Sequence, residues 1–182
     1  MTSVDGRPLV SLTVTRILPL VDEVVLVCRP DQRDALAHFG VTLVDGGDTR
    51  TDSEAAGLTA LSAVHDLIGI HDGARPNLFP GLVERLFGAA STHGGAVPVL
   101  APSSPIVELD SGQIVRAARA VQTPQVFSGP ELIAAYEDRA DVNGHDTVDV
   151  VQRFGSLTIA AVPGDPRNIK VTYPADLARV IR

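Results

Sequence analysis

The chain has 182 residues, of which 45% are hydrophobic and 20% charged, a composition typical of a single globular domain rather than a disordered chain. Its net charge of −7 argues against a broad nucleic-acid interface, although a few well-placed cations can still hold one triphosphate. No apolar run reaches the roughly 18 residues of a membrane helix, and the N-terminus lacks the apolar segment of a signal peptide.

Short β-rich runs alternate with longer helical runs along the chain. The expected helices are Leu9–Leu18, Asp31–Phe39, Asp52–Asp66, Pro80–Thr92, Pro130–Tyr136, Thr147–Phe154 and Pro174–Ile181. The expected strands are Glu23–Cys28, Val41–Val44, Leu67–His71, Ala96–Leu100, Ile106–Leu109, Ile114–Ala117, Leu157–Val162 and Ile169–Val171. This alternation predicts one α/β domain over residues 1–182, with a mostly parallel, doubly wound (Rossmann-like) sheet and helices on both faces.

The only cysteine, Cys28, ends the first expected strand. With no second thiol, a disulfide framework is impossible, and we expect Cys28 to be a small buried core residue. A reducing cytoplasm is the natural setting for such a chain.

One segment interrupts the alternation. Ser111-Gly112 lies between two β-rich runs and is typical of a two-residue β-hairpin turn. A hairpin this short does not fit inside a parallel sheet, so we expect it to project as an arm over about residues 103–121. Because an isolated apolar ribbon is marginal in water, we expect two copies of the chain to pair through their arms as a two-fold homodimer.

Polar segments follow three of the expected strands, at the edge where open α/β sheets bind ligands. They cover residues 45–53, 71–76 and 164–172. In the first segment, paired glycines let a flat ligand approach the backbone, and Ser53 offers a hydroxyl. The alternative is a plain connection between a strand and a helix.

Asp72 and Lys170 are the residues best suited to phosphate chemistry. A carboxylate at a strand end is a ligand that Mg²⁺ prefers, and an ammonium group neutralises phosphate oxygens. The alternatives are that Asp72 caps a turn and pairs with Arg75, and that Lys170 is simply solvated. His71 faces inward in the expected strand, so we expect it to be a hydrogen-bonded core histidine.

The ordered set of motifs is more specific than any one of them. The motifs are Gly46-Gly47-x-x-Arg50-x-x-Ser53-x-x-x-Gly57-Leu58, His71-Asp72-x-Ala74-Arg75-Pro76, Gln122-Thr123-Pro124-Gln125-x-Phe127 and Asn168-Ile169-Lys170-x-Thr172-x-x-x-Asp176-Leu177. From Gly6 to the end, the chain resembles the 2-C-methyl-D-erythritol 4-phosphate cytidylyltransferase family. The resemblance implies a homodimeric enzyme of non-mevalonate isoprenoid biosynthesis. With Mg²⁺ or another divalent cation, it would condense CTP with a sugar-alcohol phosphate and release pyrophosphate.

The resemblance also implies roles for single residues. The positions expected to contact the nucleotide are Gly47, Asp48 and Ser53, which match those around the cytosine, and Ala74. Asp72 matches the acid near Mg²⁺ and the ribose, and Lys170 matches the lysine of the phosphate site. Arg116 lies close to a family arginine on the dimer arm that reaches the acceptor phosphate.

The sequence departs from the family pattern in three places. The family begins with a buried strand and a Gly-rich loop that carries an arginine and a lysine, whereas this chain matches from just beyond that point. We therefore expect the first central strand of the family fold to be missing, so that the chain continues upstream, the sheet closes up, or another chain fills the slot. Ser104-Pro105 replaces an Asp-Thr pair on the arm, and His145-Asp146-Thr147 retains one of two carboxylates.

The missing loop also predicts slow cytidylyl transfer, because removing one transition-state donor commonly costs about 10²–10³ in rate. One alternative function is a catalytically inactive relative that binds partners through its arm. Another is a transferase for a different alditol phosphate, since ribitol-5-phosphate cytidylyltransferases share much of the pattern. The residues that differ on the arm are those that would contact the acceptor, so the acceptor stays open, with 2-C-methyl-D-erythritol 4-phosphate favoured.

Overall fold

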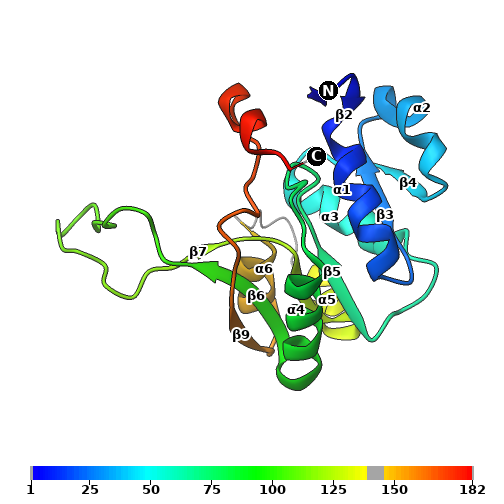
Figure 1. Cartoon of the computed structure of the whole chain (residues 1–182). Coiled ribbons are helices and arrows are strands. Elements are labelled where there is room, and N and C mark those ends of the chain that lie inside the picture. The colour runs from blue at the N-terminus through cyan, green and yellow to red at the C-terminus, as the bar shows by residue number, and fades with distance from the viewer. Residues whose placement is uncertain (1, 139–145, 182) are drawn as a thin grey trace.

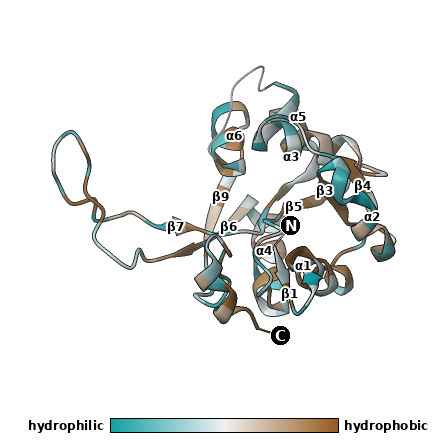
Figure 2. Cartoon of the chain, turned by 90° about the horizontal axis from the view of Figure 1, so that it is seen from above, coloured by the Kyte–Doolittle hydropathy of each residue, from teal (hydrophilic) through white to brown (hydrophobic). Residues whose placement is uncertain are grey.

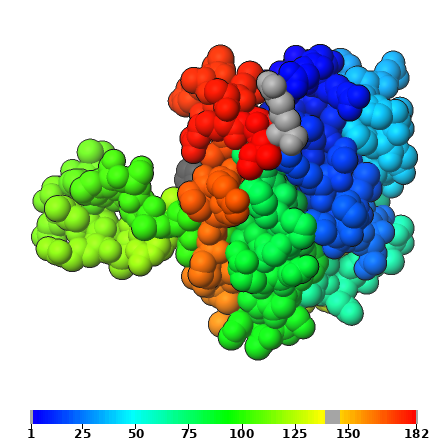
Figure 3. Space-filling model, viewed as in Figure 1, coloured from blue at the N-terminus to red at the C-terminus, as the bar shows by residue number. Residues whose placement is uncertain are grey.

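The computed structural model describes residues 2–138 and 146–181. Its body consists of strands covered by helices, and the segment around residues 101–119 leaves the body as a long arm (Figure 1). The arm stands clear of the body in the space-filling view (Figure 3). Within the described ranges, no helix combines the length and the apolar character that crossing a membrane requires.

The elements follow the predicted alternation closely. Those of the first part of the chain are β1 (Ser3–Val4), β2 (Arg7–Pro8), α1 (Leu9–Ile17), η1 (Leu18–Leu20), β3 (Val25–Cys28), η2 (Pro30–Gln32), α2 (Arg33–Leu36), η3 (Ala37–Phe39), β4 (Thr42–Asp45) and α3 (Arg50–Thr59). Those of the remainder are β5 (Leu67–Ile70), α4 (Pro80–His93), β6 (Gly94–Leu100), β7 (Ala120–Val121), β8 (Gln125–Ser128), α5 (Gly129–Glu137), α6 (Thr147–Phe154), β9 (Thr158–Pro163) and η4 (Pro174–Arg179).

Most strands run in one direction, as predicted. β3 and β4 form a parallel pair, and the larger sheet has the order β5-β8-β6-β9, with β7 beside the end of β6. β8 is antiparallel to both β5 and β6, and β9 is parallel to β6, so β5, β6 and β9 point the same way. Arg50 follows β4, Asp72 follows β5, and Arg50 Nη2 lies 3.8 Å from an Asp72 carboxylate oxygen. Because β3 is parallel to β4, the carboxyl ends of β3, β4 and β5 meet at one edge.

Helices cover both faces of the strands (Figure 2). Neighbouring residues on β6 and β8 alternate between two buried clusters, because successive side chains of a strand point to opposite faces. Val97 and Phe127 pack with α3, α5 and α6, whereas Ala96 and Val126 pack with α4. The predicted doubly wound arrangement is therefore confirmed.

The sequence of α4 explains how it covers its face of the sheet. Leu82, Leu86 and Ala90 recur every four residues and are almost fully buried, which places them on one stripe of the helix. Pro80 occupies the first turn, where its missing N–H costs nothing. Gly94 ends the helix at φ +93°, a left-handed conformation that other residues rarely adopt.

Three expected strands do not form, and some observed strands, including β8, were not predicted. The arm forms a single bridge between Val107 and Ile114 rather than two strands, and its turn spans Glu108 to Gly112 through a 2.9 Å backbone hydrogen bond. Strand β8 was not predicted, because its pairing with β5 and β6 is decided by residues far away in the chain. The expected strand at 169–171 is extended chain outside any sheet. Cys28 is buried, as predicted.

β3 and β5 do not pair with each other. In the described part of the chain, β3 pairs with β4 and β5 pairs with β8. A cavity of about 820 Å³ separates the two strands and is also lined by α1, α3 and α4. We call it the β3–β5 cavity; that it corresponds to the place of the family's first central strand stays a prediction.

Candidate functional site

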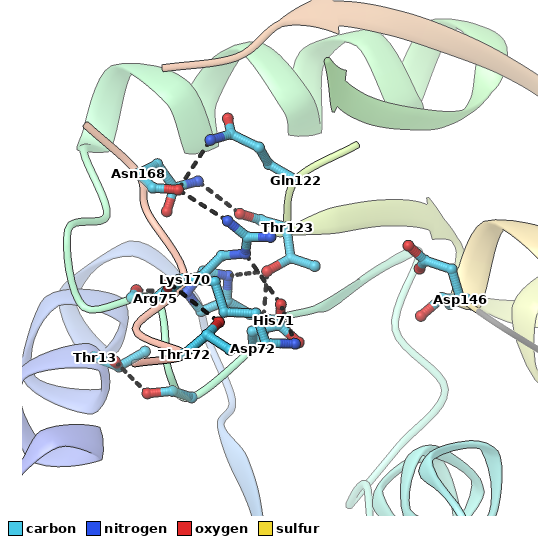
Figure 4. A network of polar contacts seen from close by, with 12 residues as sticks. Thr13, His71, Asp72, Arg75, Gln122, Thr123, Asp146, Asn168, Lys170 and Thr172 are labelled. Atoms are coloured by element: carbon cyan, nitrogen blue, oxygen red, sulfur yellow. Dashed lines mark hydrogen bonds and ion pairs between the residues drawn. The ribbon is translucent and has the colours of Figure 1, made fainter. Parts of the chain in front are cut away.

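A carboxylate surrounded by cations forms the centre of the polar edge of the sheet (Figure 4). Asp72 follows β5, and its side chain is only 14% exposed. Arg75 Nε and Lys170 Nζ lie 3.0 and 3.4 Å from one carboxylate oxygen, and Arg50 Nη2 lies 3.8 Å from the other. Burial alone would raise the pKa of Asp72, but the charges of Lys170, Arg50 and Arg75 hold it below its ordinary value. Asp72 is therefore ionised at neutral pH.

Hydrogen bonds tie the C-terminal polar segment to the loop that follows β5. The Val171 backbone N–H donates to the Ala74 carbonyl at 2.8 Å, and Arg75 Nη1 donates to the Asn168 carbonyl at 3.0 Å. Asn168 is fully buried. These contacts join residues more than 90 positions apart, and they place Lys170 beside the carboxylate.

His71 and Thr123 hold the backbone around Asp72 in place through hydrogen bonds. Thr123 Oγ1 accepts a 3.0 Å hydrogen bond from the Asp72 backbone N–H, so its own proton is directed to His71 Nδ1, also at 3.0 Å. His71 Nε2 then carries the ring proton and donates it to the Arg75 carbonyl at 3.1 Å. Burial lowers the pKa of His71 from 6.5 to about 4, so the ring is neutral at pH 7. This is the inward-facing, hydrogen-bonded histidine that the sequence predicts.

His71 should make the stability of the protein pH-dependent. Between pH 6.5 and 4 the unfolded chain protonates this ring whereas the folded chain does not, so stability falls as the pH falls. The difference from 6.5 to about 4 corresponds to about 3 kcal/mol, at about 1.4 kcal/mol per pKa unit. We expect urea unfolding at a series of pH values to show that the free energy of unfolding depends less steeply on pH for His71→Asn than for the parent. His93→Asn, at the exposed end of α4, should keep the parent slope, and equal slopes for all three proteins would contradict the assignment.

A second carboxylate fixes Arg50. Arg50 Nε donates to Glu54 at 2.7 Å, and the same carboxylate accepts the hydroxyl proton of the buried Tyr136. Burial disfavours the charge of Arg50, but the hydrogen bond to Glu54 and the negative charges of Glu54, Asp72 and Asp146 together outweigh burial and raise the pKa of Arg50. Arg50 Nη2 lies 3.7 Å from Asp146 and 3.8 Å from Asp72. A fixed guanidinium thus lies between two carboxylates at the rim of the β3–β5 cavity.

The predicted nucleotide residues lie around this edge. Ser53 lines the same cavity as Asp72 and Lys170, and its hydroxyl donates to the Thr49 carbonyl at 2.9 Å. Gly47 packs so closely that an added Cβ would lie 2.4 Å from the Cβ of Asp52, which makes the absence of a side chain necessary there. Asp48 is exposed on the same loop. The structure therefore brings the first and second polar segments together with Lys170.

Arg116 lies apart from this edge. It is exposed on the arm, which leads away from the body of its own chain (Figure 1). The pair between Asp72 and Arg75, weighed above as an alternative to a metal-binding role, is present at 3.0 Å. Of the acidic motif before α6, His145 lies outside the described residues, whereas Asp146 is at the rim beside Arg50.

Sequence reasoning assigned no role to Arg50, Glu54 or Thr123. Arg50 and Thr123 both belong to sequence motifs named above. Membership of these motifs was the sequence signal that could have pointed to a role for each. Their contacts depend on tertiary structure, because Thr123 reaches Asp72 across 51 positions. Glu54 follows Arg50 by four residues, the spacing of an ion pair on one helix face, but its partner in α5 was not visible in the sequence.

A doubly wound sheet with polar loops at the carboxyl ends of its strands is the architecture of nucleotide-binding α/β proteins. The family model described as "IspD: 2-C-methyl-D-erythritol 4-phosphate cytidylyltransferase" matches residues 1–181. The chain belongs to this family, which is a family of nucleotidyltransferases. The sequence-based identification is thereby confirmed.

Individual relatives agree with the family match. The chain is 36% identical to a 2-C-methyl-D-erythritol 4-phosphate cytidylyltransferase of Cereibacter sphaeroides, over 97% of this chain and 84% of that protein. It is also 36% identical to a bifunctional IspD/IspF enzyme of Granulibacter bethesdensis, over 98% of this chain and 49% of that protein. The cytidylyltransferase structure from Thermus thermophilus has a TM-score of 0.85 and 33% identity, covering 97% of this chain and 88% of that one.

Proposed function

We propose that this chain transfers a cytidylyl group from CTP to 2-C-methyl-D-erythritol 4-phosphate. A phosphate oxygen of the acceptor attacks the α-phosphorus of CTP, the bond from that phosphorus to the β-phosphate oxygen breaks, and pyrophosphate leaves. Family membership supports the reaction. The observation that carries the proposal is the set of three cationic side chains around Asp72 at the polar edge.

In this proposal, the chain acts mainly by positioning charge. Lys170 is 44% exposed, so its ammonium group is accessible to phosphate oxygens while Asp72 holds it in place. Such positioning and cationic stabilisation accelerate phosphoryl-type transfer without a covalent contribution from the protein. Gly47, Asp48 and Ser53 would surround the cytosine, with the close backbone approach at Gly47 in support.

We further propose that a divalent cation binds beside Asp72, since enzymes of the family generally depend on one. In the described ranges, no group of three or more His, Cys, Asp or Glu side chains could hold a metal alone. Asp72 and Asp146, on either side of Arg50, nevertheless provide the one or two carboxylates that Mg²⁺ usually takes from a protein, with phosphates supplying the rest. The cation would offset the charge of the triphosphate.

The test is a product assay on this chain. With CTP, MgCl₂ and 2-C-methyl-D-erythritol 4-phosphate, we expect equal amounts of pyrophosphate and a cytidine diphosphate ester, resolved by phosphorus NMR. Ribitol 5-phosphate and CTP alone serve as controls. Turnover with ribitol 5-phosphate but not with the methylerythritol phosphate would assign the other acceptor. CTP binding without product would favour the inactive relative instead.

We propose that the arm forms a two-fold dimer and brings Arg116 to the partner's polar edge. The arm exposes Ile106, Val107, Leu109, Ile114 and Val115, with Leu109 at 95%. Burying one leucine contributes about 1.5–3 kcal/mol, and a two-fold interface buries it twice.

We therefore expect Leu109→Asp to weaken dimerisation at least about 100-fold in sedimentation equilibrium, since about 1.4 kcal/mol is a factor of ten. Val64→Asp provides a matched control, because Val64 is 65% exposed and lies outside the arm. A parent chain that stays monomeric at high micromolar concentration would remove both the dimer and the role of Arg116.

A further inference from the structure

Arg50 is the first residue of α3, and helix stability does not account for an arginine there. A positive charge at the amino end of a helix opposes the helix dipole. The ion pair of Arg50 with Glu54, four residues later, also has the less favourable order, because an acidic residue stabilises a helix best when it precedes its basic partner. The reason for Arg50 at this position therefore lies in the site that its side chain lines.

Glu54 is held firmly by the body of the protein. Its side chain is only 10% exposed. One carboxylate oxygen accepts hydrogen bonds from Arg50 Nε at 2.7 Å and from Thr147 Oγ1 at 3.1 Å, and the other accepts one from the Tyr136 hydroxyl. Thr147 in α6 and Tyr136 in α5 are both buried. Burial raises the pKa of Tyr136, so its hydroxyl stays protonated and remains a donor to the carboxylate.

The bond to Glu54 uses only one of the three nitrogens of Arg50. Among the residues that the structure describes, the Arg50 side chain makes no other hydrogen bond. Its Nη2 atom lies 3.8 Å from Asp72 and 3.7 Å from Asp146, which is beyond hydrogen-bonding distance. A guanidinium group that is fixed through Nε and keeps both Nη groups for a ligand is suited to bidentate binding of a phosphate.

Arg75, the other arginine beside Asp72, differs from Arg50. Its side chain is only 13% exposed, and two of its nitrogens already donate, to Asp72 and to a backbone carbonyl. By contrast, Arg50 is 36% exposed and Lys170 is 44% exposed, and these two cations approach opposite oxygens of Asp72. Both line the β3–β5 cavity together with Ser53, which follows Arg50 by one helical turn. Arg50 therefore belongs to the part of the edge where we place the nucleotide.

We propose that Glu54 is a positioning residue that orients the guanidinium group of Arg50 to bind a phosphate group of the CTP triphosphate. Arg50 donates both Nη groups to phosphate oxygens while Nε stays bonded to Glu54. Tyr136 and Thr147 hold the carboxylate, so the guanidinium group loses little conformational freedom when the phosphate binds. The inference rests on the proposed use of CTP, but it requires neither an acceptor nor turnover.

Calorimetric titration with CTP and with inorganic triphosphate, each with MgCl₂ and without an acceptor, tests the contact. We expect Arg50→Ala to weaken the binding of both ligands at least about tenfold, the usual effect of losing hydrogen bonds to a charged group. Glu54→Gln keeps the shape of the side chain but removes its charge, and it should weaken both at least about threefold. An effect of Arg50→Ala on CTP but not on triphosphate would place Arg50 at the base or the ribose and overturn the proposal.

Asp149→Asn is the matched control for Glu54→Gln. Asp149 pairs with Arg153 at the same four-residue separation and the same 2.7 Å distance, but in α6. If the loss of any such pair weakened binding by loosening a helix, Asp149→Asn would have the effect of Glu54→Gln. We expect Asp149→Asn to keep the parent affinity for both ligands, and an equal loss in the two variants would overturn the role of Glu54.

A double-mutant cycle separates positioning from a purely structural role. If Glu54 acts through Arg50, Glu54→Gln should have no further effect on triphosphate affinity in an Arg50→Ala background, whereas independent effects add. Tyr136→Phe keeps the carboxylate but removes one of its donors, so it should repeat this pattern with a smaller effect. It also allows the same cycle if Glu54→Gln does not fold. Additive effects in the cycle, or an Arg50→Ala protein with the parent affinity, would overturn the proposal.

This inference and the proposed function fail separately. A chain that shows the expected changes in affinity but forms no product with the acceptor supports the inference and contradicts the proposed reaction. A chain that forms product while Arg50→Ala binds CTP and triphosphate as the parent does contradicts the inference alone. A parent chain that binds neither ligand would overturn both.

Discussion

Replacing Asp72 with asparagine should lower the free energy of unfolding at pH 7 by about 3 kcal/mol. The side chains of Asp72 and Arg75 are only 14% and 13% exposed, so the substitution leaves a largely buried guanidinium without its carboxylate. Lys170 and Arg50 also lose the neighbouring negative charge, but their side chains are more exposed, so they add less to the decrease in the free energy of unfolding. Urea unfolding followed by circular dichroism measures the change.

The same carboxylate predicts a pH dependence of that difference. Because the folded-state pKa of Asp72 is lowered, its contribution is fully present above the unfolded value of about 3.9 and is lost as the pH falls through the folded value. The gap between parent and Asp72→Asn should therefore close in acid. Asp31→Asn is the control, since its pair with Arg29 is exposed and should contribute under about 1 kcal/mol. An Asp72→Asn protein as stable as the parent at pH 7 would show that the cluster does not stabilise the fold.

Replacing Lys170 with alanine should reduce kcat/KM for cytidylyl transfer by about 10²–10³, the usual effect of removing one transition-state donor. Its partly exposed pair with Asp72 at 3.4 Å implies a loss of stability under about 1 kcal/mol. Activity and stability should therefore separate, in contrast to Asp72→Asn. Lys170→Arg keeps the positive charge but places it on a planar guanidinium group, so its kcat/KM should lie between those of the parent and Lys170→Ala.

Initial rates of pyrophosphate release, with each protein checked for folding, measure this effect. Arg153→Ala is a suitable control, because Arg153 is exposed and its ion pair with Asp149 lies within α6. Lys170→Ala with the parent rate, or a drop of the same size in Arg153→Ala, would place the phosphate chemistry elsewhere.

The fold was predictable wherever local pattern and burial agree. The regular spacing of Leu82, Leu86 and Ala90 marked α4, and the apolar runs marked β3, β5 and β6. β8 was missed because its pairing with β5 and β6 is decided by residues far away in the chain. The arm was identified as a projecting segment, but the body does not pack against it, and without such support only one bridge forms.

The site was predictable to the extent that strand ends determine it. Asp72 and Lys170 were chosen as polar residues beside expected strands, and the structure places them 3.4 Å apart. The positions of Arg50 and Thr123 depend on Glu54 and on contacts that cross the sheet, which no local pattern reveals. Their roles in catalysis, like those of the other site residues, stay predictions.

Lys170 allows a direct test of the central claim, because it is the only lysine in the sequence. An amine-directed reagent followed by peptide mapping reports on this one side chain, with the N-terminal amine as an internal control. If the edge around Asp72 binds the triphosphate of CTP, saturating CTP and Mg²⁺ should slow the labelling of Lys170 at least about tenfold and leave the N-terminus unaffected. Labelling of Lys170 at the same rate with and without CTP, under conditions where CTP binding is measured independently, would contradict the account.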